Sequence, residues 1–208
     1  MMNSTENLKN ILAYTKSSNS GYHGKNFETG YHTLEVNGET LPGQRNPLQR
    51  LENVPYDFTD KVVLDIGSNQ GGMLFALKDV IAGGVGVDYD YRLVNAANAL
   101  STHYESTNTS FYVHDLDKDP IQLIESYTDK QYDIVFLLAV CMWIKSWKET
   151  IRWVSQNSKH CLFETNGTKE QQNDQIDELS RYYDNVMLIN EKSLDDPKQH
   201  NRRLYLCH

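Results

Sequence analysis

A glycine-rich turn between an apolar run and a helix-forming run carries the clearest chemistry in this sequence. Residues 62–66 read Val-Val-Leu-Asp-Ile, and the small-residue run Gly-Ser-Asn-Gln-Gly-Gly follows at 67–72. This succession predicts a strand, a tight turn and a helix. Small residues let the backbone approach a ligand closely, and a helix start offers unpaired N–H groups. We therefore expect a polar ligand at this turn.

The residues around the turn restrict the kind of ligand. A phosphate-binding loop needs Gly-Lys-Ser/Thr, whereas Gly72 is followed by Met73. A dinucleotide-binding turn needs G-x-G-x-x-G, whereas Gly67 and Gly71 lie four residues apart. Asp88 ends the next apolar run, about 20 residues after the turn, the spacing at which an acid meets a ribose. A carboxylate at that position can accept hydrogen bonds from both ribose hydroxyls.

The pattern Asp65-x-Gly67-x-x-x-Gly71, with Asp88 downstream, resembles the first two motifs of class I S-adenosylmethionine-dependent methyltransferases. The first motif of that family is Asp/Glu-x-Gly-x-Gly-x-Gly, and Asn69 stands here in place of the middle glycine. The resemblance implies that S-adenosyl-L-methionine is the cofactor. It also implies that Asp88 holds the cofactor ribose and that Asp65 organises the loop facing the methionine part.

The resemblance predicts further cofactor contacts, two of which have a plain alternative. Asp115, followed by Leu116 at the end of a strand, would accept from the adenine amino group, or it caps the following turn. Arg45 would hold the methionine carboxylate if its segment closes over the site, or it is a surface charge or the partner of an acidic core. The predicted cofactor-binding residues are Arg45, Asp65, Gly67, Ser68, Asn69, Gly71, Asp88, Tyr89, Asp115, Leu116 and Ala139.

Alternating strand and helix patterns position these residues in an α/β fold. Strand patterns occur at 62–66, 85–87, 110–115, 132–140, 161–165, 185–189 and 203–207, and helix patterns at 71–78, 91–104, 121–127, 148–154 and 169–183. We predict a doubly wound, seven-stranded, mostly parallel sheet. In the methyltransferase family the last strand of this order is antiparallel, so the resemblance implies the same here.

The first part of the chain is predicted to be a cap. A helix over 3–14, a loop over 17–30 and a hairpin over 31–41 with an Asn-Gly turn would form it. We place the N-terminal cap, a substrate-covering extension, at residues 1–56 and the S-adenosylmethionine-binding domain at 57–208.

Composition narrows the class of protein. The 208 residues are 39% hydrophobic and 23% charged, which suits one folded domain with a short extension. A net charge of −8 argues against broad attachment to nucleic acid. No apolar run approaches the roughly 18 residues of a membrane helix, and no signal peptide pattern opens the chain, so we expect a cytoplasmic protein without a membrane partner. Cys141, Cys161 and Cys207 are expected to be buried thiols, and no metal site is predicted.

Methyl transfer from a sulfonium is a direct displacement. The protein must align the acceptor behind the methyl group and, for a weak nucleophile, remove its proton. Acceptor-side residues should lie after the strands at 132–140 and 161–165. The Asn/Asp-Pro-Pro-Tyr/Phe loop of amino-methylating DNA enzymes is missing there, as are the acids of catechol-type and ribose 2′-O-methyltransferases. Glu164 and His32 are the predicted catalytic bases, and His114 and His23 are further candidates.

A narrower resemblance concerns the acceptor. Residues 43–45, 64–67 and 140–147 are similar to the methyltransferase core of tRNA uridine carboxymethyl-transfer enzymes and of bacterial proteins linked to surface-sugar synthesis. Trp143 stands where that group often has a His, so no catalytic His is carried over. We predict a small-molecule acceptor with hydroxyl groups, such as a sugar or sugar nucleotide.

Two alternatives stay open. A tRNA-modifying uridine alkyl- or methyltransferase would show a basic stripe, formed by Arg45, Arg50, Arg202 and Arg203. A non-catalytic, S-adenosylmethionine-binding regulatory protein would show an acceptor pocket blocked by Trp143 or Trp147.

Overall fold

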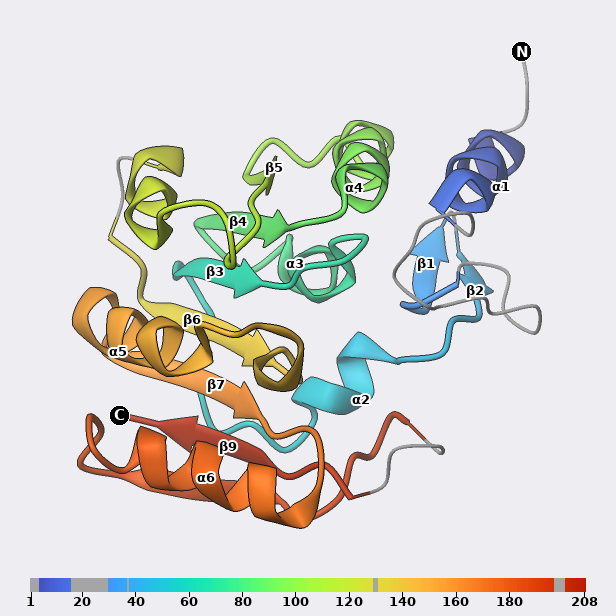
Figure 1. The fold of residues 1–208 in the computed structure, drawn as a ribbon. Helices are drawn as coiled ribbons and strands as arrows, with labels where there is room; N and C mark the ends of the chain where they lie inside the picture. Colours follow the sequence, from blue (N-terminus) through green and yellow to red (C-terminus); the bar gives the residue numbers. More distant parts are fainter. Residues whose placement is uncertain (1–3, 16–29, 37, 129–130, 197–200) are drawn as a thin grey trace.

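A seven-stranded sheet forms the centre of this computed structural model, which describes residues 4–15, 30–36, 38–128, 131–196 and 201–208 (Figure 1). The strands are β3 (Val62–Ile66), β4 (Gly83–Asp88), β5 (Thr109–Val113), β6 (Ile134–Leu138), β7 (His160–Glu164), β8 (Val186–Asn190) and β9 (Leu204–Cys207). Their order is β5-β4-β3-β6-β7-β9-β8, with β3 to β7 parallel and β9 antiparallel to both neighbours. The predicted doubly wound sheet with an antiparallel last strand is confirmed.

Helices cover both faces of the sheet because alternate strand residues point to opposite sides. They are α3 (Gly72–Leu77), α4 (Tyr91–His103), η1 (Ile121–Tyr127), η2 (Cys141–Trp143), α5 (Trp147–Asn157) and α6 (Lys169–Leu179). Val63 joins a hydrophobic core with α3 and α4, whereas its neighbours Val62 and Leu64 join a second core with η1, α5 and α6. The three cysteines are buried with free thiols.

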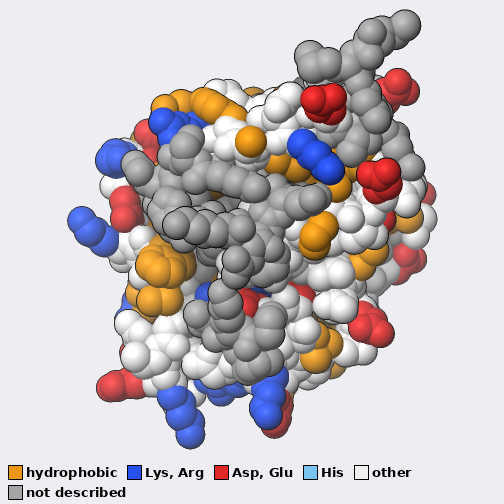
Figure 2. All heavy atoms as spheres, turned by 90° about the vertical axis from the view of Figure 1, so that its right-hand side faces the viewer, with side chains coloured by type: hydrophobic (Ala, Val, Ile, Leu, Met, Phe, Trp, Pro, Cys, Tyr) orange, Lys and Arg blue, Asp and Glu red, His pale blue; other side chains and the backbone are white. Residues whose placement is uncertain are grey.

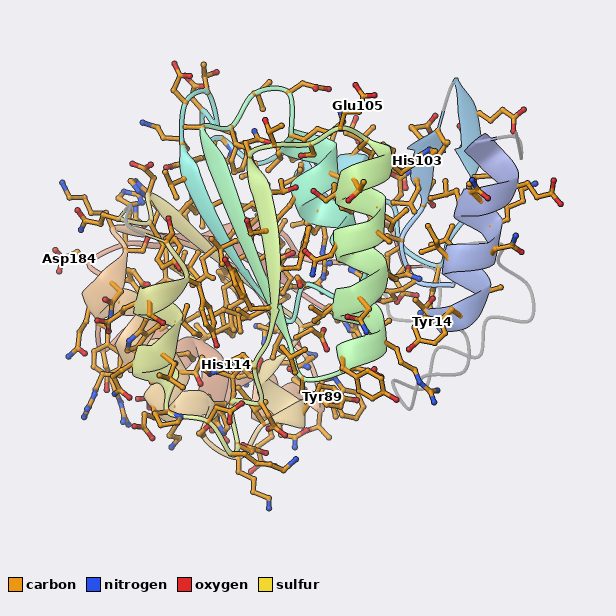
Figure 3. The ribbon with its side chains drawn as sticks, turned by 90° about the horizontal axis from the view of Figure 1, so that it is seen from above. Tyr14, Tyr89, His103, Glu105, His114 and Asp184 are labelled. Carbon is orange, nitrogen blue, oxygen red and sulfur yellow. The ribbon has the colours of Figure 1, made fainter. Side chains whose placement is uncertain are left out.

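The first elements of the chain are α1 (Ser4–Thr15), β1 (Leu34–Val36), β2 (Glu39–Leu41) and α2 (Pro47–Leu51). The pairing of the predicted hairpin is confirmed, because β1 pairs antiparallel with β2, while Asn37 of its predicted turn lies outside the described residues. Helix α1 lies beside α4 (Figure 3), and its fully buried Leu8 and Leu12 share the core of α3 and α4. Residues 16–29, which hold most of the predicted loop and His23, lie outside the described residues. The domain boundary at residue 56 stays a prediction.

The strands β3, β4, β6 and β7 all end at the same edge of the sheet (Figure 1), and this edge faces the viewer in Figure 2. On that face hydrophobic side chains form small groups between charged ones. Among the described residues, no helix combines the length and apolarity needed to cross a bilayer.

Candidate active site

A cavity of about 540 Å³ lies where strands β3, β4, β5 and β6 end. Parallel strands that diverge to helices on opposite faces leave a crevice at this edge, where α/β proteins bind ligands. The residues that line it are Tyr31, Ile66, Gly67, Asn69, Val87, Asp88, Tyr89, Leu93, His114, Asp115, Leu116, Asp117, Lys118, Leu138, Ala139, Val140, Trp143 and Ile144. Seven of the predicted cofactor residues are among them, namely Gly67, Asn69, Asp88, Tyr89, Asp115, Leu116 and Ala139.

The glycine turn has the backbone that its sequence predicts. Gly67 has φ +80°, and a Cβ on it would lie 2.7 Å from Cγ2 of Val140. Its N–H and that of Ser68 donate to the carbonyl of Val87 at 2.8 and 3.0 Å, which ties the turn to the end of β4. Asn69 has φ +52°, a left-handed conformation that asparagine tolerates better than most residues. Asparagine can therefore replace the middle glycine of the motif here.

Asp88 faces this turn with both carboxylate oxygens oriented. One accepts from the N–H of Asn69 at 2.9 Å and the other from the N–H of Asp90 at 3.0 Å. Each oxygen keeps a second lone pair, so the carboxylate can still accept from two hydroxyl groups. Burial raises the pKa of Asp88 to about 6.

Asp65 lies in β3 behind the cavity wall and is 2% exposed. Its Oδ2 and the hydroxyl of Ser68 are buried with no hydrogen-bond partner among the described residues. Burial raises the pKa of Asp65 to about 7, while Arg50 acts to lower it and Asp88 to raise it. Asp65, Ser68 and Gly71 are thus placed at the turn but not in the cavity lining.

The end of β5 supplies the residues predicted for the adenine. Asp115 lines the cavity, yet its carboxylate also accepts from Lys118 Nζ at 2.6 Å and from the N–H of Asp117 at 3.1 Å. The bond from Lys118 holds the pKa of Asp115 below its usual value. Both interpretations of Asp115, cavity wall and turn cap, therefore match its position.

His114 lines the same part of the cavity, at the same edge of the sheet as Tyr89 (Figure 3). Its Nδ1 lies 3.1 Å from the hydroxyl of Tyr127, and burial lowers its pKa. The ring of Tyr127 stacks on that of Tyr112, with ring centres 4.3 Å apart. This stack keeps the imidazole in place.

Arg45 and Glu164 lie outside the cavity lining, in a buried ionic cluster. Nη2 of Arg45 is 2.8 Å from Glu164 Oε1, and its Nε is 2.7 Å from Asp195 Oδ2. Arg50 pairs with the other oxygen of Glu164. In this structure Arg45 is the partner of an acidic core, which is the alternative stated for it, and its contact with the methionine carboxylate stays a prediction.

These contacts do not match the role of catalytic base that was predicted for Glu164. Both of its oxygens accept hydrogen bonds from guanidinium groups. Neither oxygen is therefore placed to take a proton from an acceptor in the cavity.

His32 is likewise outside the cavity lining. It is 2% exposed, and its ring packs so closely on the start of α3 that a Cβ on Gly72 would lie 2.4 Å from its Cγ. Burial, with Arg50 and Arg45 nearby, lowers its pKa to about 3. The cavity is lined instead by its neighbour Tyr31, which the sequence analysis did not select. The bridge between His32 and Arg45 that holds this segment has no local sequence signal.

Two aromatic side chains stand exposed at the cavity. Tyr89 is 56% exposed and Trp143 is 67% exposed, and both line the cavity. Trp147, by contrast, is not part of the lining. The cavity therefore combines the buried carboxylate of Asp88 with two exposed aromatic rings.

Comparisons with known proteins agree with this arrangement. The sequence model of the methyltransferase domain family matches residues 44–201. The N-terminal domain of EvdMO1, solved with SAH bound, superposes with a TM-score of 0.70 at 10% identity, covering 100% of this chain and 98% of that one. The same domain solved in the presence of SAH and D-fucose gives a TM-score of 0.69 at 10% identity, covering 100% of this chain and 97% of that one.

A third structure, precorrin-6y C5,15-methyltransferase from Geobacter metallireducens GS-15, gives a TM-score of 0.56 at 14% identity. It covers 77% of this chain and 86% of that one. No curated protein sequence matches the chain. At these identities the structures establish a shared fold.

Proposed function

We propose that this chain, which belongs to the methyltransferase domain family, transfers the methyl group of S-adenosyl-L-methionine to a small hydroxylated acceptor such as a sugar or sugar nucleotide. Membership of the family makes the chain an S-adenosylmethionine-dependent methyltransferase. The identity of the acceptor is the part of the proposal that goes beyond the family.

The residues at the buried end of the cavity fit the cofactor. The turn at Gly67 leaves room that a Cβ would fill, and Asp88 offers two oriented oxygens to a ribose. When bound, S-adenosylmethionine supplies an electrophilic methyl group on a sulfonium. Asp88 would orient the ribose, and His114 and Leu116, which line the same cavity, would surround the base.

The aromatic end of the cavity is the observation that carries the acceptor proposal. Trp143 and Tyr89 are both largely exposed and both line the cavity, so an acceptor in the cavity can contact them. Indole and phenol rings have an apolar face for the C–H groups of a sugar, and the tyrosine has a polar tip. A cavity of about 540 Å³ is of the size that holds small molecules and cofactors. The structural neighbour crystallised in the presence of SAH and D-fucose supports the same class of acceptor.

The predicted signs of the two alternatives are not met by these side chains. Arg45, Arg50 and Arg202 are at most 9% exposed, and the half-buried Arg203 donates to Asn173 Oδ1 at 2.9 Å, so these four residues form no exposed basic stripe for tRNA. Trp143 stands at an open cavity, and Trp147 is not in its lining. A small acceptor is therefore favoured over both alternatives.

Label transfer tests the proposal. The purified protein is incubated with S-adenosylmethionine labelled on the methyl group and with separate pools of sugar nucleotides, free sugars, lipids and tRNA. We expect label in a sugar or sugar-nucleotide pool, and none with Asp88→Ala. Asp133→Asn is a matched control, because Asp133 accepts from the N–H of Val62 at the opposite end of β3. Label in tRNA or lipid alone would overturn the acceptor class.

A further inference from the structure

The loop after β6 begins with an unfavourable backbone conformation at the cavity wall. Ala139 has φ +60°, in the left-handed region that alanine rarely occupies. It lines the cavity, and the loop continues through Val140 to Trp143. Such a conformation persists only where surrounding contacts hold it, and it is commonest at functional sites. The contacts that hold this loop therefore identify the residues that shape the cavity.

One buried side chain holds both ends of that turn. Nδ2 of Asn166 donates to the carbonyl of Ala139 at 2.5 Å, and its Oδ1 accepts from the N–H of Met142 at 3.0 Å. Asn166 is fully buried and follows β7. Because a carbonyl only accepts and an N–H only donates, this pair of bonds fixes the orientation of the amide.

A second buried amide holds Asn166 from helix α6. Oε1 of Gln175 accepts from the N–H of Asn166 at 3.1 Å, and its Nε2 donates to the carbonyl of Asn166 at 2.9 Å. The same Nε2 lies 3.3 Å from Asn166 Oδ1. The helix is anchored by a capping box between Thr168 and Gln171. A continuous set of hydrogen bonds therefore runs from α6 through Asn166 to the turn at the cavity.

The 139–143 turn, held in this conformation, positions two groups of the site. The side chain of Val140 covers Gly67 in the cofactor turn. The backbone N–H of Trp143 donates to the carbonyl of Val140 at 2.9 Å, which fixes the backbone position from which the exposed indole projects. A change in the turn would move both the cofactor turn and the aromatic end of the cavity.

We infer that Asn166, held by Gln175, is a positioning residue that keeps the 139–143 turn in its strained form, and that Trp143 is thereby presented as the platform on which the acceptor packs. The part that concerns the acceptor rests on the proposed function. The part that concerns Asn166 and Gln175 does not depend on which acceptor is used.

Fluorine NMR on protein labelled with 5-fluorotryptophan tests the positioning role. The chain has three tryptophans, and Trp143→Phe assigns the resonance of Trp143. In Gln175→Ala we expect that resonance to shift and broaden while those of Trp147 and Trp153 stay in place. Calorimetry with S-adenosylhomocysteine should show about a tenfold weaker Kd, equivalent to about 1.4 kcal/mol.

Gln172→Ala is the matched control. Gln172 lies on the same helix, is 2% exposed, and bonds Thr165 at 2.8 Å and the carbonyl of Gly167 at 3.2 Å, without a bond to Asn166. It should leave the Trp143 resonance and the Kd within about twofold of wild type. An unchanged resonance and Kd in Gln175→Ala, or equal effects in Gln172→Ala, would overturn the inference. If Gln175→Ala does not fold, Asn166→Asp serves in its place, because it keeps the acceptor for Met142 and loses the donor to Ala139.

The role of Trp143 as a platform is tested by turnover with the sugar pool that receives the labelled methyl group. Trp143→Ala should raise the KM for this sugar pool at least fivefold, while the Kd for S-adenosylhomocysteine changes less than about threefold. In Trp143→Phe the KM should stay close to the wild-type value, because an aromatic ring is kept. An unchanged KM in Trp143→Ala would overturn the platform. If wild type binds S-adenosylhomocysteine but labels no sugar, the proposed acceptor and the platform both fail, while the NMR result still decides the role of Asn166.

Discussion

The affinity of the protein for S-adenosylhomocysteine should depend on pH through Asp88. Burial raises the pKa of this carboxyl to about 6, so it is ionised at pH 8 and mostly protonated at pH 5. The ribose hydroxyls donate hydrogen bonds, and an ionised carboxylate accepts them more strongly than a protonated one. If only the ionised form binds, the apparent Kd is multiplied by one plus the protonated-to-ionised ratio.

That ratio gives the magnitude. With a pKa of about 6 it is about 10 at pH 5 and about 0.01 at pH 8, so the Kd should weaken by about elevenfold, or about 1.4 kcal/mol. Calorimetric titration across this range measures it. Asp88→Asn removes the ionisation, so its weaker affinity should vary less than about twofold over the same range. A flat profile in wild type, or the wild-type slope retained in Asp88→Asn, would refute the reasoning.

Three further predictions concern stability and the turn. Burial raises the pKa of Asp65 to about 7, so the folded chain binds the proton of this carboxyl more tightly than the unfolded chain does. The free energy of unfolding should therefore fall as pH rises from about 4 to about 7. Thermal unfolding of the ligand-free protein should show Asp65→Asn more stable than wild type at pH 8, with the difference lost at pH 4. Glu164→Ala leaves the buried guanidiniums of Arg45 and Arg50 without their shared partner, and urea unfolding should show a loss of about 3–5 kcal/mol; a loss below 1 kcal/mol would contradict the ionic role. Gly67→Ala forces a Cβ to within 2.7 Å of Val140 at φ +80°, so calorimetry should detect no binding of S-adenosylhomocysteine, and native affinity would argue against the turn as the cofactor cradle.

The elements of the sheet were predictable because their signals are local. The apolar run at 62–66 and the small residues at 67–72 encode a strand and a turn within a few residues, and β3 and the turn have those positions. Helix ends were less predictable. The pattern at 169–183 predicted a helix that in fact ends at Leu179. Tyr183 packs in the core after the helix has ended, so its ring extended the apparent helical pattern without belonging to the helix.

The ionic cluster shows what the sequence could not reveal. Arg45 meets Glu164 and Asp195, which are 119 and 150 residues away along the chain. No local pattern marks such partners, so the sequence alone could not decide whether Arg45 contacts the ligand or pairs with an acidic core. The same holds for Asn166, because its bond to Ala139 depends on the packing of β6 against β7.

The place of β9 in the sheet has a consequence during synthesis. Strand β8 joins the sheet only through β9, which is inserted between β7 and β8 although it follows both in the sequence. While residues 204–207 are still inside the ribosome, the nascent chain exposes the unpaired edge of β7 and leaves β8 without a partner. Such an edge is a template for pairing with other chains. We expect this protein to depend on chaperones until β9 emerges, and ribosome-bound chains stalled before residue 204 to aggregate more readily than chains that include β9.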